Sequence, residues 1–306
     1  MGHGSYQSKD WDRLRSARNI SSQSTVQDLY QSRKMKDFLN PRGIKYRESC
    51  DSLDNPASTA IIFGLDVTGS MGYLSEEIAK GALNRTMLEI YDKAPVTNPH
   101  IMFQAIGDSK SDEAPLQTTQ FEADIRIAEQ LLEVYFEGRG GGNGGESYLL
   151  SWYFADRHTK IDCFEKRKEK GFLFTIGDEC CHETLTQAEI ERVFGEKSGD
   201  CTAQELFKEA SRKYEIFHIT MKAGSYKSQN SGEAWKKLIG NRALELDPED
   251  LDVLPEIFVS LMQYAKGAEE KAILNQWNGK AAQVVKQILQ EMGPLTEDKK
   301  KKFLFF

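Results

Sequence analysis

The 306-residue sequence lacks the features that mark membrane, exported and nucleic-acid-binding proteins. No apolar run approaches the roughly 18 residues that span a bilayer. The first residues, Met1 to Gln7, carry no apolar signal segment. The formal net charge is −7, whereas a general nucleic-acid-binding surface is usually basic. We therefore expect no membrane segment and no nucleic-acid partner.

Cysteine is scarce and follows no metal-binding or disulfide pattern. The sequence has an odd number of cysteines and no Cys-x-x-Cys pair. Cys180, Cys181 and His182 are adjacent, but no second cluster accompanies them to complete a zinc set. Without an export signal, we expect reduced thiols and a cytoplasmic location. The cysteines are Cys50, Cys163, Cys180, Cys181 and Cys201.

The most informative stretch runs from Ala60 to Gly72, Ala-Ile-Ile-Phe-Gly-Leu-Asp-Val-Thr-Gly-Ser-Met-Gly. Its apolar start predicts a strand buried on both faces, which ends at a glycine-containing turn. Asp66, Thr68 and Ser70 alternate, so in an extended segment their oxygens project from one side. Such an oxygen-only set suits Mg²⁺ or Mn²⁺. Alternatively, these side chains cap the next helix.

Two further apolar runs also lead into a carboxylate. The predicted strand from His100 to Ile106 is followed by Asp108, and the run from Lys170 to Gly177 is followed by Asp178. A short strand over residues 116–121 is expected to form a hairpin with the 100–106 strand. Strands that alternate with helices predict a mostly parallel sheet, and ligands bind at the carboxyl ends of such strands.

A glycine-rich segment lies between these strands. Residues 138–145 contain six glycines, and Glu146 and Ser147 follow them. Glycine at this density indicates close backbone approach, because its conformational entropy makes it costly to order. No Lys-Ser or Lys-Thr pair follows, so the segment is not a Walker-type nucleotide loop.

The spacing Asp66-x-Thr68-x-Ser70 resembles the metal-ion-dependent adhesion site (MIDAS) of von Willebrand factor type A (vWA) domains, which use Asp-x-Ser-x-Ser. The resemblance implies a doubly wound, Rossmann-like α/β fold. Its six strands would lie in the order 3-2-1-4-5-6, with the short third strand antiparallel. The resemblance covers residues 58–266.

The resemblance also implies ligand roles. Thr68 and Ser70 would bind Mg²⁺ (or Mn²⁺ or Ca²⁺) directly, while Asp66 and Asp178 would orient ligands or act through water. The glycine-rich segment would supply a second loop, where the family has Thr and this chain has Glu146 or Ser147. Which of these two residues reaches the ion stays open, as does the role of Asp108.

The function that the resemblance implies is divalent-metal-dependent protein–protein interaction, not catalysis. A partner protein would offer an acidic side chain to the metal. Intracellular vWA proteins commonly act as adaptors in larger assemblies, often beside AAA+ ATPases. One alternative is a Mg²⁺-dependent phosphotransferase or phosphatase of the haloacid dehalogenase type with Asp66 as nucleophile, although Thr68 stands where that family has a second Asp. The other is an interaction scaffold without metal.

We expect three parts along the chain. Residues 1–57 form an N-terminal arm, disordered in its first 20 residues and helical over residues 25–38. Residues 58–266 form the vWA domain. Residues 267–306 form a helical extension, broken at Asn278-Gly279, with a basic and aromatic tail from Lys299 to Phe306.

Overall fold

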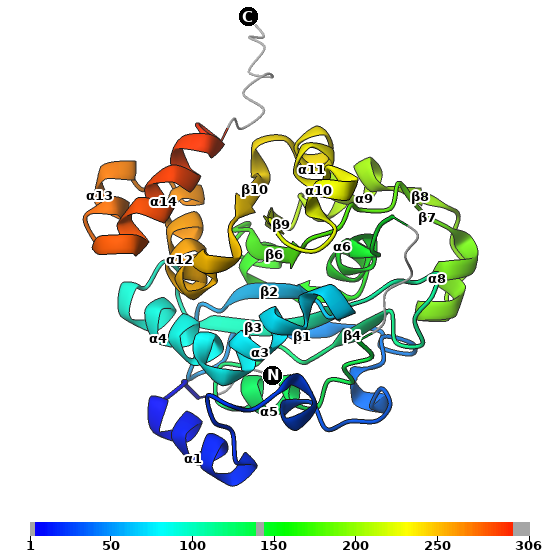
Figure 1. The fold of residues 1–306 in the computed structure, drawn as a ribbon, viewed down its shortest axis with the longest axis horizontal. Coiled ribbons are helices and arrows are strands. Elements are labelled where there is room, and N and C mark those ends of the chain that lie inside the picture. The colour runs from blue at the N-terminus through cyan, green and yellow to red at the C-terminus, as the bar shows by residue number, and fades with distance from the viewer. Residues whose placement is uncertain (1–3, 139–143, 296–306) are drawn as a thin grey trace, which may run out of the picture.

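The computed structural model describes residues 4–138 and 144–295 of the chain. Its centre is a six-stranded sheet in the order β10-β9-β6-β2-β3-β4 (Figure 1). All neighbouring strands are parallel except β3 and β4, which are antiparallel. The predicted order and the predicted antiparallel third strand are therefore confirmed. The strands are β2 (Thr59–Asp66), β3 (Pro99–Ile106), β4 (Leu116–Thr118), β6 (Gly171–Gly177), β9 (Tyr214–Met221) and β10 (Ala243–Leu246).

Strand β2 lies in the middle of the sheet because all of its side chains are apolar, small or paired, and every residue is buried. Its Phe63 stacks between Phe103 of β3 and Phe174 of β6, with ring centroids 5.6 and 5.5 Å away. Phe258 covers this row at 4.6 Å from Phe63. The aromatic row fixes the register of three adjacent strands and brings their carboxyl ends to one edge.

Helices cover both faces of the sheet (Figure 1). The helices after β2 pack on one face, whereas those after β6 pack on the other. Strands β2 and β6 are neighbours, so this is the point where a doubly wound sheet reverses direction. One face carries α3 (Gly72–Glu77), the π-helical turn η3 (Ile78–Ala82), α4 (Leu83–Lys93), α5 (Arg126–Leu131) and α12 (Leu254–Ala265); the other carries α6 (Tyr148–Arg157), α7 (Asp162–Glu165), α8 (Gln187–Phe194), α9 (Ala203–Ala210) and α11 (Ser231–Ile239).

The N-terminal arm differs from its prediction. Residues 8–18 form helix α1 (Ser8–Arg18), so the expected disorder is absent from the described part of the first 20 residues. The helix predicted over residues 25–38 is two short pieces, α2 (Val26–Leu29) and the 3₁₀ turn η1 (Asp37–Leu39). The chain leaves the helix at Tyr30, whose buried hydroxyl donates to the Ser75 carbonyl at 3.1 Å. Burial of apolar arm residues against the domain outweighs local helix propensity.

Helix α5 is short and spans residues 126–131. Before it, Glu122 pairs with Ile101 of β3 as an antiparallel bridge. After it, the Gln117 side chain bonds both the N–H and the carbonyl of Tyr135, at 2.9 and 2.8 Å. These bonds hold both flanks outside a helix.

Four very short strands were not predicted. β1 (Arg47–Ser49) pairs in parallel with β5 (Thr159–Ile161), and β7 (Thr184–Leu185) pairs antiparallel with β8 (Cys201–Thr202). Strands of two or three residues show no readable alternation of apolar and polar residues.

The C-terminal extension contains α13 (Glu270–Leu274) and α14 (Gly279–Met292), and the predicted break at Asn278-Gly279 is confirmed. Its buried residues join the apolar layer that covers the sheet. The tail from Lys299 to Phe306 lies outside the described residues. Within residues 4–138 and 144–295, no helix is long and apolar enough to cross a membrane. The remaining short elements are η2 (Gly69–Met71), α10 (Tyr226–Gln229), η4 (Gly240–Arg242) and η5 (Pro248–Val253).

Candidate metal centre

The first predicted loop folds around Asp66, the last residue of β2. The Asp66 carboxylate is fully buried. Its Oδ1 accepts hydrogen bonds from the Thr68 backbone N–H at 2.9 Å and from Thr68 Oγ1 at 2.6 Å. Asp66 therefore fixes the turn that presents Thr68 and Ser70 at the carboxyl end of the sheet.

The second oxygen of Asp66 is held by a residue that the sequence analysis did not single out. The Tyr148 hydroxyl, from the first residue of α6, donates to Asp66 Oδ2 at 2.8 Å. Tyr148 is also fully buried. The Asp66 carboxylate is thus held by hydrogen bonds on both of its oxygens.

The loop after β6 meets the first loop directly. Ser70 Oγ donates to Asp178 Oδ1 at 3.0 Å, and the Ser225 backbone N–H donates to Asp178 Oδ2 at 2.8 Å. Asp178 is fully buried, whereas Ser70 is exposed. The structure therefore brings together the strand ends of β2 and β6, as their neighbouring places in the sheet require.

The hydroxyls of Thr68 and Ser70 are oriented in a way that suits a cation. Each hydroxyl has one proton and two acceptor lone pairs. Both donate that proton to a buried carboxylate, Thr68 to Asp66 and Ser70 to Asp178. Their lone pairs consequently remain available as oxygen ligands.

Glu146 and Ser147, which the sequence left as alternatives, have different surroundings. Glu146 is 1% exposed, and its Oε2 has no hydrogen-bond partner in the described part of the chain. Ser147 Oγ instead accepts from the Ser109 N–H at 2.8 Å and donates to Asp108 Oδ1 at 3.2 Å. The contacts favour Glu146 as the loop contribution to the site, because Ser147 is used to anchor the start of α6.

Burial and mutual repulsion raise the pKa values of acidic side chains in this region. Burial raises the pKa of Glu146 well above its usual range, and the neighbouring Asp66 raises it further. The pKa of Asp66 is also raised by burial, with Asp178 adding to the rise against the lowering effect of the Thr68 hydrogen bonds. No Lys, Arg or His of the described residues forms an ion pair with Asp66, Asp178 or Glu146. A bound cation would relieve this repulsion.

Two glycines allow the close approach of the loops. A Cβ at Gly177 would collide with the Tyr148 hydroxyl and with Asp66 Oδ2. A Cβ at Gly224 would collide with Asp178 Oδ2, and Gly224 has a φ of +47°. Both positions therefore require glycine for the carboxylates to stay where they are.

The residues fit a hard divalent ion by donor type. The set is made of oxygens alone, from Asp66, Thr68, Ser70, Glu146 and Asp178. One of them, the buried Glu146 Oε2, has no hydrogen-bond partner among the residues that the structure describes. Such donors match Mg²⁺ and Mn²⁺. In the part of the chain that the structure describes, no three side chains of His, Cys, Asp or Glu gather in a metal-binding arrangement. A metal site at this edge of the sheet would therefore need the two hydroxyls as ligands.

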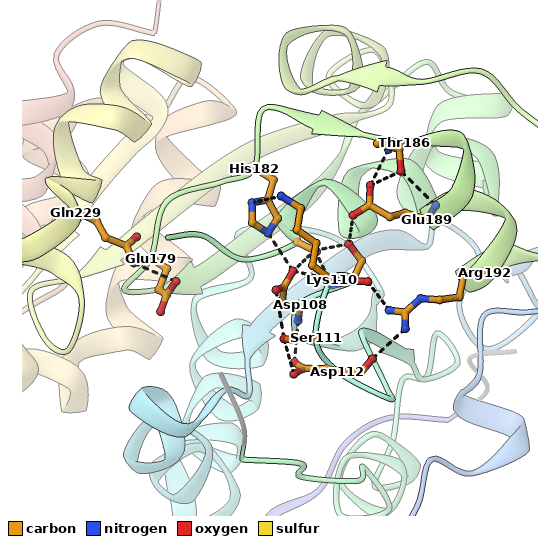
Figure 2. Close-up of polar contacts among 12 residues, drawn as sticks. Asp108, Lys110, Ser111, Asp112, Glu179, His182, Thr186, Glu189, Arg192 and Gln229 are labelled. Atoms are coloured by element: carbon orange, nitrogen blue, oxygen red, sulfur yellow. Dashed lines mark hydrogen bonds and ion pairs between the residues drawn. The ribbon is translucent and has the colours of Figure 1, made fainter. Parts of the chain in front are cut away.

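Asp108 belongs to a separate polar network at the end of β3 (Figure 2). His182 Nε2 lies 2.9 Å from Asp108 Oδ1, and Lys110 Nζ lies 3.2 Å from His182 Nδ1. Figure 2 shows these three side chains pointing toward one another. Asp108 is buried and also accepts from Ser147 and Ser111. Asp108 therefore lies at the predicted carboxyl edge of the sheet, and its hydrogen bonds connect the neighbouring loops.

The sequence analysis did not single out Tyr148, Gly224 or Ser225, and it named His182 only as part of a Cys-Cys-His run. Gly224 and Ser225 follow β9, whose carboxyl end lies at the same edge as those of β2 and β6. A glycine directly after a predicted strand was thus a usable signal. Tyr148 and His182 had no such signal, because their roles depend on packing between loops distant in sequence.

Comparisons with known proteins add little beyond the architecture. No family model matches the chain, and no curated protein matches it. Several solved structures resemble it. The SpaC pilus adhesin from Lactobacillus rhamnosus GG, in an open conformation, is 9% identical with a TM-score of 0.46, and the match covers 72% of this chain but only 31% of that chain.

Two smaller structures are matched over nearly their whole length. The vWF domain of the type V pili tip protein Mfa5 from Porphyromonas gingivalis is 10% identical, with a TM-score of 0.46 and coverage of 70% of this chain and 98% of that chain. BatB from Bacteroides thetaiotaomicron is 15% identical, with a TM-score of 0.39 and coverage of 68% and 100%. The assigned fold rests on this chain's own strand order.

Proposed function

We propose that this chain is a divalent-metal-dependent protein-interaction module of the vWA, MIDAS-bearing type. The observation that carries the proposal is the contact between two strand ends, Ser70 with Asp178. Near it, a buried Glu146 carboxylate oxygen that interacts electrostatically with Asp66 has no hydrogen-bond partner among residues 4–138 and 144–295. Strand ends at a switch point form ligand sites in open α/β sheets. An oxygen-only site there suits a hard cation.

Thr68, Ser70 and Glu146 would hold the ion, while Asp66 and Asp178 orient the hydroxyls by accepting their protons. The ion would supply a coordination position that an oxygen of a partner protein fills. Partner binding would then require the metal. Mg²⁺ is the first choice and Mn²⁺ the second, because Mg²⁺ prefers few protein ligands and retains water or a partner oxygen. Ca²⁺ would need more ligands than these loops supply.

The location and the assembly are further parts of the proposal. All five cysteines are free, which agrees with a reducing, cytoplasmic environment. The vWA resemblance adds an adaptor role in a larger complex, with an AAA+ ATPase as one possible class of partner.

The phosphotransferase alternative has less support. Asp66 is fully buried, and hydrogen bonds hold both of its oxygens, whereas a nucleophilic carboxylate must reach the phosphorus of its substrate. Thr68 donates to Asp66 and offers no carboxylate as acid or base. No feature of the described residues favours this chemistry over binding.

Calorimetric titration of Mg²⁺ and Mn²⁺ into chelator-stripped protein tests the proposal. The wild type should bind one ion, and the double variant Asp66→Ala/Ser70→Ala should lose this binding. Ser16→Ala, which changes an exposed serine on α1, is the matched control and should bind as the wild type does. Absence of binding in the wild type would instead favour the scaffold without metal.

A further inference from the structure

The loop after β9 lies against the loop that carries Asp178. It spans residues 223–231 and contains the single helical turn α10 (Tyr226–Gln229), in which none of the four described residues is buried. Two serines of this loop bind Asp178: the Ser225 N–H donates to Oδ2, and Ser231 Oγ donates to the carbonyl, both at 2.8 Å. Because α10 buries no side chain in the core, polar contacts such as these hold it in place.

Gln229, the last residue of α10, contacts the two residues that follow Asp178. Its Oε1 accepts from the Cys180 N–H at 3.0 Å, and its Nε2 donates to Glu179 Oε2 at 3.1 Å. Figure 2 shows the side chains of Gln229 and Glu179 directed at one another. The other oxygen of Glu179 accepts from Ser225 Oγ at 3.1 Å. One neutral amide thus serves a backbone donor and a side-chain acceptor at once.

The Cys180 backbone extends this contact to the loop that carries Glu146. The Glu146 N–H donates to the Cys180 carbonyl at 2.9 Å, and Glu146 also pairs with Cys181 as a single parallel bridge. The N–H of Cys180 therefore faces Gln229, while its carbonyl faces Glu146. A displacement of Gln229 would change the positions of both neighbouring loops.

From these contacts we propose that Gln229 is a positioning residue. It fixes the Asp178 loop and the Glu146 loop relative to each other without binding the ion itself. Its effect on ion binding rests on the proposed metal-dependent function, whereas its effect on the two loops does not. Because the amide is neutral, this effect comes from geometry and not from charge. Removing a group that orients metal ligands commonly weakens metal affinity by about 10- to 100-fold.

Gln229→Met tests the proposal, because Met has a similar length and helix propensity but replaces neither hydrogen bond. Calorimetry should show Mg²⁺ affinity weakened by about 10- to 100-fold. Ser228→Ala is the matched control on the same turn. Ser228 is exposed, and its hydroxyl bonds only the Ser225 carbonyl within the turn, at 3.0 Å. The control should bind Mg²⁺ as the wild type does. Equal losses in both variants would overturn the proposal, since the stability of α10 alone would then set the affinity.

An exchange of the two side chains distinguishes positioning from general destabilisation. Gln229→Glu alone puts a second carboxylate against Glu179 and should also weaken Mg²⁺ binding. The double variant Glu179→Gln/Gln229→Glu exchanges amide and carboxylate, which restores the hydrogen bonds at unchanged net charge. Its Mg²⁺ affinity should recover most of the loss, because residues in contact do not act additively. A double variant that binds more weakly than Gln229→Glu would overturn the proposal.

Amide hydrogen exchange in a chelator measures the positioning of the loops without metal. In Gln229→Met, the amides of Cys180 and Glu146 should exchange about two- to tenfold faster, whereas the amides of β6 should not change. If the wild type binds no Mg²⁺ but these two amides respond, the proposed function fails and the positioning role stands. If the wild type binds Mg²⁺ and Gln229→Met binds it equally tightly, the positioning role fails and the proposed function stands.

Discussion

The Tyr148 hydroxyl donates a 2.8 Å hydrogen bond to Asp66 Oδ2, linking the start of α6 to the end of β2 inside the protein. Both residues are fully buried, so no solvent replaces this bond when it is lost. The pair joins two elements on which the first and second loops of the candidate site depend. It is the only hydrogen bond that the described residues provide to this oxygen.

Tyr148→Phe should lower the free energy of unfolding by about 1–3 kcal/mol, because it leaves a buried carboxylate oxygen without a donor. Tyr153→Phe on the same helix is the matched control: its hydroxyl bonds Glu196, whose side chain is 45% exposed, so water can replace the bond. Urea unfolding of both variants at neutral pH measures the difference. Equal losses in the two variants would contradict the assigned role of Tyr148.

Gly224→Ala should weaken metal binding by about 10- to 100-fold, the usual effect of disturbing groups that orient ligands. The added Cβ collides with Asp178 Oδ2, which must then move away from Ser70. Gly240→Ala is the control, because Gly240 also has a positive φ (+66°) but no atom within 4 Å of the added Cβ. The control should cost about 1–3 kcal/mol of stability, because Gly240 has a backbone conformation (φ +66°, ψ −137°) that Ala rarely adopts, and should leave metal affinity unchanged. Calorimetry with Mg²⁺ distinguishes a site effect from backbone strain.

Asp108→Asn tests whether Asp108 is a metal ligand; we expect that it is not. The substitution weakens the bonds from His182 and Ser147 to Oδ1 and should lower the free energy of unfolding by about 1–3 kcal/mol. Mg²⁺ affinity should change little, whereas Asp66→Asn should abolish it. A loss of Mg²⁺ binding in Asp108→Asn as large as in Asp66→Asn would show that Asp108 is a ligand.

The metal-free protein, kept in a chelator, should lose stability as pH rises. The pKa values of Asp66 and Glu146 are raised by burial and by neighbouring acids, so the folded state retains protons that the unfolded chain has released. Wherever the folded state binds more protons, stability falls with pH, here above the ordinary carboxyl pKa of about 4. Melting temperatures in a chelator should therefore fall from pH of about 5 to about 9.

Glu146→Gln removes one of these two acids. The melting temperature of this variant should therefore fall less steeply with pH than that of the wild type. Mg²⁺ should stabilise the wild type more at high pH than at low pH, since the ion competes with protons for the carboxylates. Identical pH slopes for wild type and Glu146→Gln would contradict the shifted pKa of Glu146.

The sequence predicted the sheet well because strong local patterns coincide with the fold. The apolar run before Asp66 forms the central strand. The polar residues that follow this run, Asp66 and Thr68, therefore lie at the end of the strand. The strand order came from the vWA resemblance and agrees with the observed sheet. These features depend on residues close together in the chain, so one sequence suffices to recognise them.

Other features depend on contacts between distant segments. Tyr148 was visible only as one residue of an apolar helix, yet its hydroxyl meets Asp66 across 82 positions. His182 appeared as part of a Cys-Cys-His run, whereas the fold pairs it with Asp108. The folded arm was also missed, because its polar sequence conceals Trp11 and Tyr30, which pack into the core. No local pattern encodes such pairings.

The most direct test of the central claim is an anomalous difference map from crystals of chelator-stripped protein soaked in Mn²⁺. We predict one strong peak within coordination distance of Thr68 Oγ1 and Ser70 Oγ, with a Glu146 carboxylate oxygen as a third ligand. A peak that lies elsewhere, or no peak at saturating Mn²⁺, would contradict the metal-dependent account of this protein.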